Sequence, residues 1–145
     1  MKSLPLLLLT GLILLGAYPA SATQDAKAKD PLYQISYKAP EAVKVGTEAP
    51  CNLTITPKEG WVLKTETPFK LEVAAKEGVT LPQVSFSSKD FVDPQEPAKT
   101  VATLFNAQKA GKHGIDAKFT FFVCSDSICK RQKDTAQCTF DALQN

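Results

Sequence analysis

The apolar residues of this chain fall in short, β-rich runs divided by proline and glycine. Runs of this kind, bounded by turn residues, are typical of β-strands. The pattern predicts strands at Leu32–Lys38, Ala49–Thr56, Trp61–Lys64, Phe69–Ala75, Gln83–Phe86, Lys99–Ala110, His113–Cys124 and Ala136–Leu143. No longer window keeps the 3.6-residue period of an amphipathic helix. Several strands at regular spacing indicate one all-β domain, a sandwich or a barrel.

Four segments between these runs carry turn residues. They are Pro57–Gly60, Lys76–Gly78, Asp93–Pro97 and Gly111–Gly114. Each combines proline or glycine with charged or polar neighbours, which predicts a chain reversal between strands. The only histidine, His113, lies in the last of them and is expected to be a turn residue.

Alternation along the predicted strands assigns side chains to faces, because successive side chains of a strand point to opposite sides. Cys51 shares an apolar face with Leu53 and Ile55 and is expected to point inward. In the run 113–124, the apolar face carries Ile115, Ala117, Phe119, Phe121 and Val123. Cys124 falls on the opposite face with Phe122 and is expected to point outward, whereas Cys138 shares the expected inner face of the last run with Phe140 and Ala142.

These faces favour one of the three pairings that four cysteines allow. Cys51–Cys138 would be a buried structural bridge, which stabilises the fold by roughly 4 kcal/mol in the chain-entropy model. Cys124–Cys129 would be a local, exposed bridge that gains much less from chain entropy. The rival pairing, Cys51 with Cys124 packed against Trp61, resembles that of antibody domains. A four-cysteine zinc site has little support because no Cys-x-x-Cys pair occurs, so no metal is expected.

The first 30 residues resemble an export signal and a leader. Lys2 precedes a leucine-rich stretch that ends before Ala20-Ser21-Ala22, a small-x-small cleavage site. We therefore expect a signal peptide at 1–22, a flexible leader at 23–30 and one domain at 31–145. All the cysteines lie in that domain, which agrees with a periplasmic or secreted location where disulfides form.

The charge balance and residue content exclude several function classes. Lysine and arginine number 17 and the acidic residues 15, so nothing predicts binding to nucleic acid or, after signal cleavage, to a membrane. With one histidine and no Gly-x-Ser-x-Gly motif, a hydrolase has few candidate residues. No cofactor is indicated by any motif.

The run Phe121-Phe122-Val123-Cys124-Ser125-Asp126-Ser127-Ile128-Cys129 resembles the active hairpin of the N-terminal domain of the periplasmic thiol:disulfide interchange protein DsbD and its relatives. The resemblance extends from about Tyr33 to Leu143. It implies an immunoglobulin-like sandwich in which Cys124 and Cys129 alternate between dithiol and disulfide. It also implies that Phe91, in a cap loop, shields the pair. The implied partner is a thioredoxin-like or other periplasmic redox protein.

Three features depart from that family. Lys130-Arg131-Gln132 replaces the apolar turn that often follows the second cysteine, and the pair Cys51 and Cys138 is additional. The membrane-embedded electron channel and thioredoxin-like domain that accompany the module in the full-length protein are not part of this chain. An interaction module with two structural disulfides and no enzymatic activity is therefore the alternative function.

Thiol–disulfide exchange needs a thiolate and an accessible sulfur. Lys130, Arg131 and Lys133 lie close to Cys129 in the sequence and would favour a thiolate, whereas Asp126 would oppose it. Phe122 and Ile128 could form an apolar landing site for a partner. The sequence leaves open which cysteine would form the mixed disulfide.

Overall fold

The computed structural model describes residues 31–145. The expected signal peptide at 1–22 and leader at 23–30 lie outside the described residues. Within the described part, nine strands and one short 3₁₀ helix, η1 (Ser88–Asp90), form the domain. No helix in residues 31–145 is long and apolar enough to cross a membrane.

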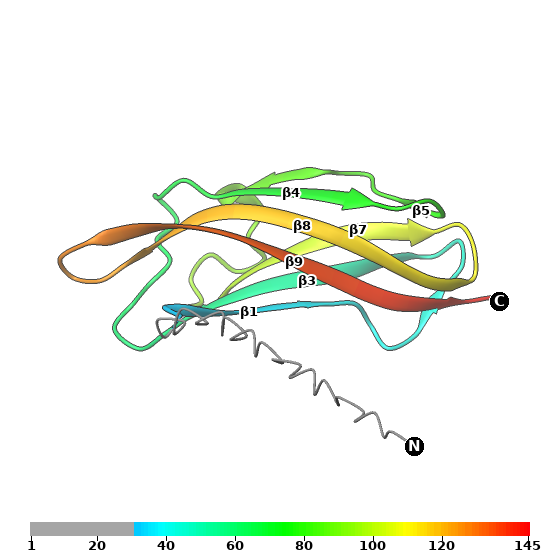
Figure 1. Cartoon of the computed structure of the whole chain (residues 1–145), viewed down its shortest axis with the longest axis horizontal. Helices are drawn as coiled ribbons and strands as arrows, with labels where there is room; N and C mark the ends of the chain where they lie inside the picture. The colour runs from blue at the N-terminus through cyan, green and yellow to red at the C-terminus, as the bar shows by residue number, and fades with distance from the viewer. Residues whose placement is uncertain (1–30) are drawn as a thin grey trace, which may run out of the picture.

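Two sheets lie face to face (Figure 1). One contains, in order, β1 (Tyr33–Lys38), β3 (Glu48–Pro57), β7 (Lys99–Ala107) and β5 (Val79–Thr80). The other contains β2 (Val43–Lys44), β9 (Cys129–Leu143), β8 (Gly111–Cys124), β4 (Lys70–Ala75) and β6 (Ser85–Ser87). The order β1-β3-β7 opposite β9-β8-β4 matches the A-B-E and G-F-C strands of immunoglobulin domains. The predicted all-β, immunoglobulin-like sandwich is confirmed.

The core lies between the inner faces of the two sheets. Cys51, Leu53 and Ile55 of β3 are buried, as alternation predicted. The apolar face of β8 and the last three inward residues of β9 are buried as well, namely Ile115, Ala117, Phe119, Phe121, Val123, Cys138, Phe140 and Ala142. The period-2 pattern therefore identified the inner faces of the three strands that carry the cysteines.

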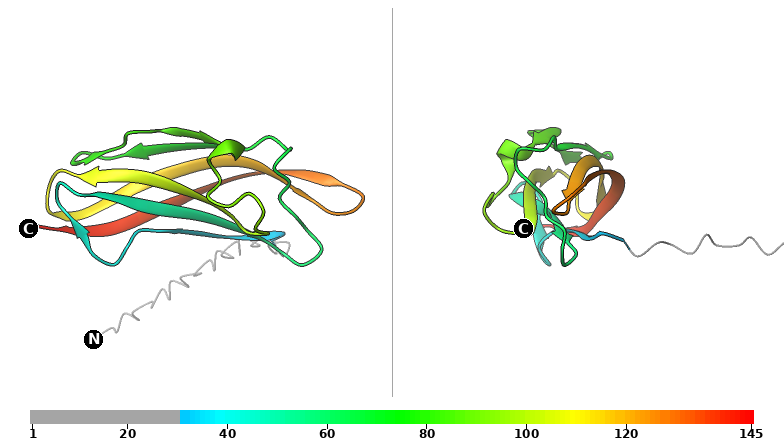
Figure 2. Two further views of the ribbon diagram at one scale, coloured as in Figure 1. Left: turned by 180° about the vertical axis from the view of Figure 1, so that it is seen from behind. Right: turned by 90° about the vertical axis from the view of Figure 1, so that its left-hand side faces the viewer.

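The longest element is the hairpin of β8 and β9. Its 14 residue pairs run from Gly111↔Ala142 to Cys124↔Cys129. At the cysteine end it projects beyond the other strands (Figures 1 and 2). Strand β9 begins at Cys129, seven residues before the predicted Ala136, because 130–136 pairs with β8 although its side chains are mostly polar. Hydrogen bonds to β8, rather than apolar burial, hold this part of β9 in the sheet.

Other predicted boundaries were wrong in ways that have local causes. Gly111–Gly114 belongs to β8, so His113 is a strand residue opposite Phe140 and not a turn residue. The reversal lies three residues earlier, at 108–110, and Gly111 with φ +112° begins the strand. Trp61–Lys64 is not a strand, and only Val62 within it forms an isolated bridge. The two-residue strands β2 and β5 are too short to give a sequence pattern.

Candidate functional site: the hairpin disulfide

The interior disulfide connects the two sheets. Cys51 on β3 and Cys138 on β9 are both fully buried, and their Cα atoms are 6.4 Å apart. Beside the bridge, the Thr103 hydroxyl donates a 2.9 Å hydrogen bond to the carbonyl oxygen of Cys51. The Tyr37 hydroxyl lies 2.7 Å from the same threonine oxygen, and burial raises the pKa of Tyr37. This closed environment gives another molecule no access to the sulfurs, as expected for a structural bridge.

The second disulfide closes the tip of the β8–β9 hairpin. Cys124 and Cys129 lie directly opposite each other with their Cα atoms 4.0 Å apart. The amide and carbonyl of Cys124 bond to Val62 on the other side of the strand, at 2.9 and 2.8 Å. Cys124 and Cys129 therefore form a pair without mutual main-chain hydrogen bonds, the geometry in which opposing side chains approach most closely. The favoured pairing is confirmed, and the antibody-like pairing is wrong.

A four-residue loop, 125–128, connects the two cysteines. The amide of Ser125 donates to the Ile128 carbonyl at 2.8 Å, and the Ser125 hydroxyl oxygen accepts weaker bonds from the amides of Ser127 and Ile128. Serine at the start of a turn often makes such local bonds. The loop therefore has its own hydrogen bonds in addition to the disulfide.

The two cysteines differ in exposure. Cys129 is exposed, whereas Cys124 is fully buried. Register places both on the outer face of the five-stranded sheet, as alternation predicted for Cys124, but the predicted exposure of Cys124 is wrong. The segment around Val62 continues the sheet beyond Cys124, so this residue does not lie at an open edge. A molecule that approaches the bridge from solvent meets Cys129.

Apolar side chains border the bridge. Ile128 is 52% exposed in the loop, and Val62 is 46% exposed beside Cys124. Phe122, two residues before Cys124 on the same face, lines a hollow of about 360 Å³ together with Pro68, Phe69, Lys70, Thr120 and Arg131. Phe122 is on the face of Cys124 and Ile128 is in the loop, and their contact with a partner stays a prediction. Sequence reasoning missed Val62, because an isolated valine in a predicted strand gives no functional signal.

Phe91 lies in the core. It is buried, its ring centroid is 4.9 Å from that of Phe69, and it forms an isolated bridge with Val101 of β7. Phe91 therefore packs against Phe69, which lines the hollow. The residue whose main chain is hydrogen-bonded to Cys124 is Val62. The shielding role of Phe91 stays a prediction.

The basic residues after Cys129 lie on two different faces. The Lys130 ammonium lies 5.3 Å from the centre of the Trp61 ring, on the face opposite to Cys129. Arg131 and Lys133 share the face of Cys129, and Arg131 borders the hollow. Of the three cations named from the sequence, Arg131 and Lys133 are therefore the two on the sulfur side, while Asp126 is exposed in the loop.

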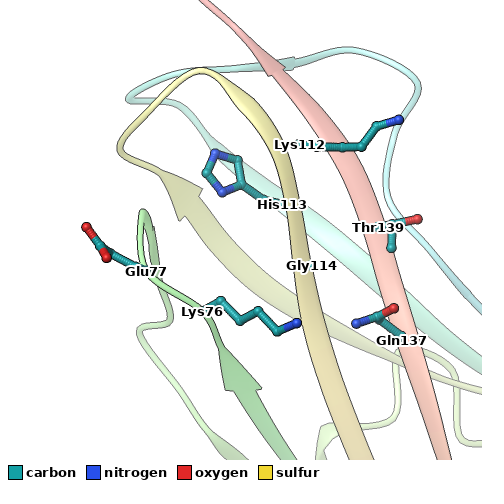
Figure 3. A pocket seen from close by; sticks show the side chains of 7 residues that line it. All are labelled: Lys76, Glu77, Lys112, His113, Gly114, Gln137 and Thr139. Carbon is teal, nitrogen blue, oxygen red and sulfur yellow. The ribbon is translucent and has the colours of Figure 1, made fainter.

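A second hollow, of about 280 Å³, lies toward the other end of β8 (Figure 3). Lys76 extends toward Gly114 and Gln137, while Glu77 points away and pairs with Lys109 at 2.9 Å. His113 borders this hollow, but its Nε2 atom is already 2.7 Å from the Lys109 carbonyl oxygen. No group of three metal-ligating side chains occurs in residues 31–145. The cysteine pair is the better candidate for chemistry.

No protein-family model and no curated protein matches the chain. Among solved structures, WR4, a C. elegans MSP family member, is similar over 77% of this chain and 98% of its own, with 9% identity and a TM-score of 0.39. AggA, the major subunit of aggregative adherence fimbriae type I from Escherichia coli, is similar over 77% and 94%, with 10% identity and a TM-score of 0.37. Likeness at this level carries no argument about function, which depends on the geometry described above.

Proposed function

We propose that the hairpin disulfide is a thiol–disulfide exchange centre in an exported protein, and that its partner is a thioredoxin-like or other redox protein of the periplasm. The observation that carries the proposal is the contrast between the two bridges. One is enclosed between the sheets, and the other lies at a projecting tip with one exposed cysteine and exposed apolar neighbours. The resemblance of 121–129 to the DsbD hairpin agrees with this assignment.

The difference in exposure assigns an order to the reaction. A partner thiolate attacks the Cys129 sulfur and forms a mixed disulfide, and the bond to Cys124 breaks with its electron pair left on the Cys124 sulfur, which takes a proton from water. The second partner thiolate then attacks the partner's sulfur in the mixed disulfide and releases Cys129. The products are a dithiol at 124 and 129 and a disulfide in the partner, so two electrons have moved. The reverse sequence oxidises the dithiol.

The neighbouring groups favour the encounter. Ile128 and Val62 offer apolar surface on either side of the bridge, and the hollow beside Phe122 can accept an apolar side chain. Arg131, on the face of Cys129, stabilises negative charge that develops on sulfur during exchange. The interior bridge holds the sandwich together while the hairpin bridge is open.

Single-cysteine variants test the proposed order. In Cys124→Ser, the exposed Cys129 thiol remains, and in Cys129→Ser the buried Cys124 thiol remains. We expect the Cys129 thiol to react with an oxidised Cys-x-x-Cys peptide on the order of tenfold faster than the Cys124 thiol, because the Cys129 thiol is exposed. Mass spectrometry of the adducts over time measures both rates. Equal rates, or no adduct with either variant, would overturn the assignment.

One observation favours the alternative, a non-enzymatic interaction module in which both bridges are structural. Cys124 is fully buried and bonded on its other side to Val62, so the bridge also connects β9 to the segment around Val62. If this alternative holds, the double variant Cys124→Ser, Cys129→Ser is less stable than the parent chain. Its exchange activity does not change, because the parent chain has none. A trapped mixed disulfide from Cys124→Ser in cells would exclude it.

A further inference from the structure

The outer faces of the two sheets differ in charge. The four-stranded sheet presents mainly uncharged polar or small side chains, and its strands place only Lys38 and Glu48 as charged residues on that face. On the outer face of the five-stranded sheet, the strand residues include six cations and three anions, which are Lys44, Lys70, Lys112, Lys118, Arg131, Lys133, Glu72, Asp116 and Asp141. The sulfurs of the hairpin bridge belong to this second, basic face.

The excess positive charge lies in the half of that face nearer the bridge. Arg131 is opposite Phe122, Lys133 is opposite Thr120, and Lys118 follows two residues further along β8. The only acidic strand residue in this half is Glu72, which pairs with Lys70 at 2.9 Å and lies opposite Lys118 across the β4–β8 ladder, so one negative charge stands against the four cations Lys70, Lys118, Arg131 and Lys133. In the far half, Lys112 faces Asp141 directly across the ladder, and the remaining two charges, Lys44 and Asp116, have opposite signs.

Asp126, in the tip loop, is the one acidic side chain between the cysteines. With it, this half-face and the tip loop together carry four cations and two anions, so an excess of positive charge remains. The field around the bridge is therefore positive over a stretch of several residues, although the chain as a whole carries a formal charge of only +2.

We infer that the partner of the hairpin disulfide is a dithiol protein whose reactive cysteines are surrounded by acidic residues, and that it docks on this basic half-face. The inference rests on the proposed exchange function and specifies its partner. Complementary charge accelerates encounter and rejects partners of the wrong sign, while the apolar contacts at Ile128, Val62 and the hollow hold the complex.

Three reduced Cys-x-x-Cys peptides serve as probes, identical except for flanking glutamates, glutamines or lysines. The rate at which each peptide reduces the hairpin bridge is measured by alkylation of the released thiols. At an ionic strength of about 0.01 M, where charges act over about 30 Å, we expect the glutamate peptide to react about tenfold faster than the lysine peptide. At about 1 M the ratio should approach one, because screening then acts within about 3 Å.

Two charge-reversal variants locate the effect. The variant Lys118→Glu with Lys133→Glu changes the basic half-face and should abolish or reverse the preference for the glutamate peptide. The matched control, Lys38→Glu with Lys112→Glu, changes the net charge by the same amount away from the bridge and should retain the preference. All four lysines are exposed, so folding should be maintained. Equal reduction of both variants by dithiothreitol at an ionic strength of about 1 M, where the charge of its attacking thiolate is screened, verifies that the bridge itself is unchanged.

The outcomes separate the two proposals. A ratio near one at low ionic strength, or equal losses in the two variants, overturns the acidic-partner inference and leaves exchange at the hairpin intact. If neither the peptides nor dithiothreitol opens the hairpin bridge before the Cys51–Cys138 bridge, the exchange function itself fails, and the partner inference fails with it.

Discussion

Removing the two disulfides one at a time should cost very different amounts of stability. The Cys51–Cys138 bridge joins residues 87 apart in the sequence, and the Cys124–Cys129 bridge joins residues 5 apart. In the chain-entropy model these separations correspond to about 4.6 and about 2 kcal/mol of stabilisation at 25 °C. Replacing Cys51 and Cys138 by alanine also removes two fully buried sulfurs from the core, which adds to the first loss.

Urea denaturation of the two double alanine variants, compared with the oxidised parent chain, measures the difference. We expect Cys51→Ala, Cys138→Ala to lose at least about 2.5 kcal/mol more than Cys124→Ala, Cys129→Ala, since this is the entropic difference alone. The hairpin variant should keep a cooperative transition with an unchanged m-value, because the sandwich between the sheets is untouched. An equal loss in the two variants, or a larger loss in the hairpin variant, would refute the reasoning that the Cys51–Cys138 bridge contributes more to stability than the hairpin bridge.

Three further outcomes follow from single side chains. Burial and the hydrogen bond to Asp134 raise the pKa of Tyr33 from 10.0 to about 12, so the unfolded chain loses this proton first and stability should fall between these pH values. Tyr33→Phe should reduce that fall in denaturation curves recorded at pH 9 and pH 12. Lys99→Met removes the hydrogen bonds from the buried Lys99 ammonium to the carbonyls of Pro94 and Glu96, so it should cost about 1–3 kcal/mol and speed amide exchange in 93–98. Ile128→Ser should slow reduction of the hairpin bridge by the glutamine-flanked peptide severalfold and leave reduction by dithiothreitol unchanged, and equal slowing with both reductants would contradict the apolar contact.

Much of the fold follows from the period of the apolar residues. The alternation in β3, in β8 and at the end of β9 identified the inner faces, and with them the pairing of Cys51 with Cys138. The prediction worked there because these strands cover the core, where burial on one face imposes a strict period of two.

The same reasoning did not succeed where hydrogen bonds, rather than burial, determine the structure. The polar first half of β9, which begins at Cys129, is paired with β8 through main-chain hydrogen bonds. A pattern of hydrophobic residues does not predict such pairing. The buried Cys124 forms an isolated bridge with Val62, which is 62 residues distant in the sequence and carries no local signal of that contact. Long-range main-chain contacts of this kind appear only with the folded chain.

The candidate site was predicted in its composition and not in its geometry. The sequence identified Cys124, Cys129, Phe122 and Ile128, because two cysteines so close together predict a hairpin bridge with its neighbours. The difference in exposure between the two cysteines, and the separation of Lys130 from Arg131 onto opposite faces, depend on the exact start of β9. A shift of one residue in that register would exchange the two faces.

A glutathione redox titration tests the exchange function most directly. The chain is equilibrated over a series of potentials, and mass spectrometry after alkylation counts reduced thiols at each cysteine. We expect the hairpin pair to be half-reduced between about −120 and about −270 mV, the range of disulfide carriers, while Cys51 and Cys138 stay oxidised. A hairpin midpoint below about −300 mV, as for structural disulfides, would contradict the account.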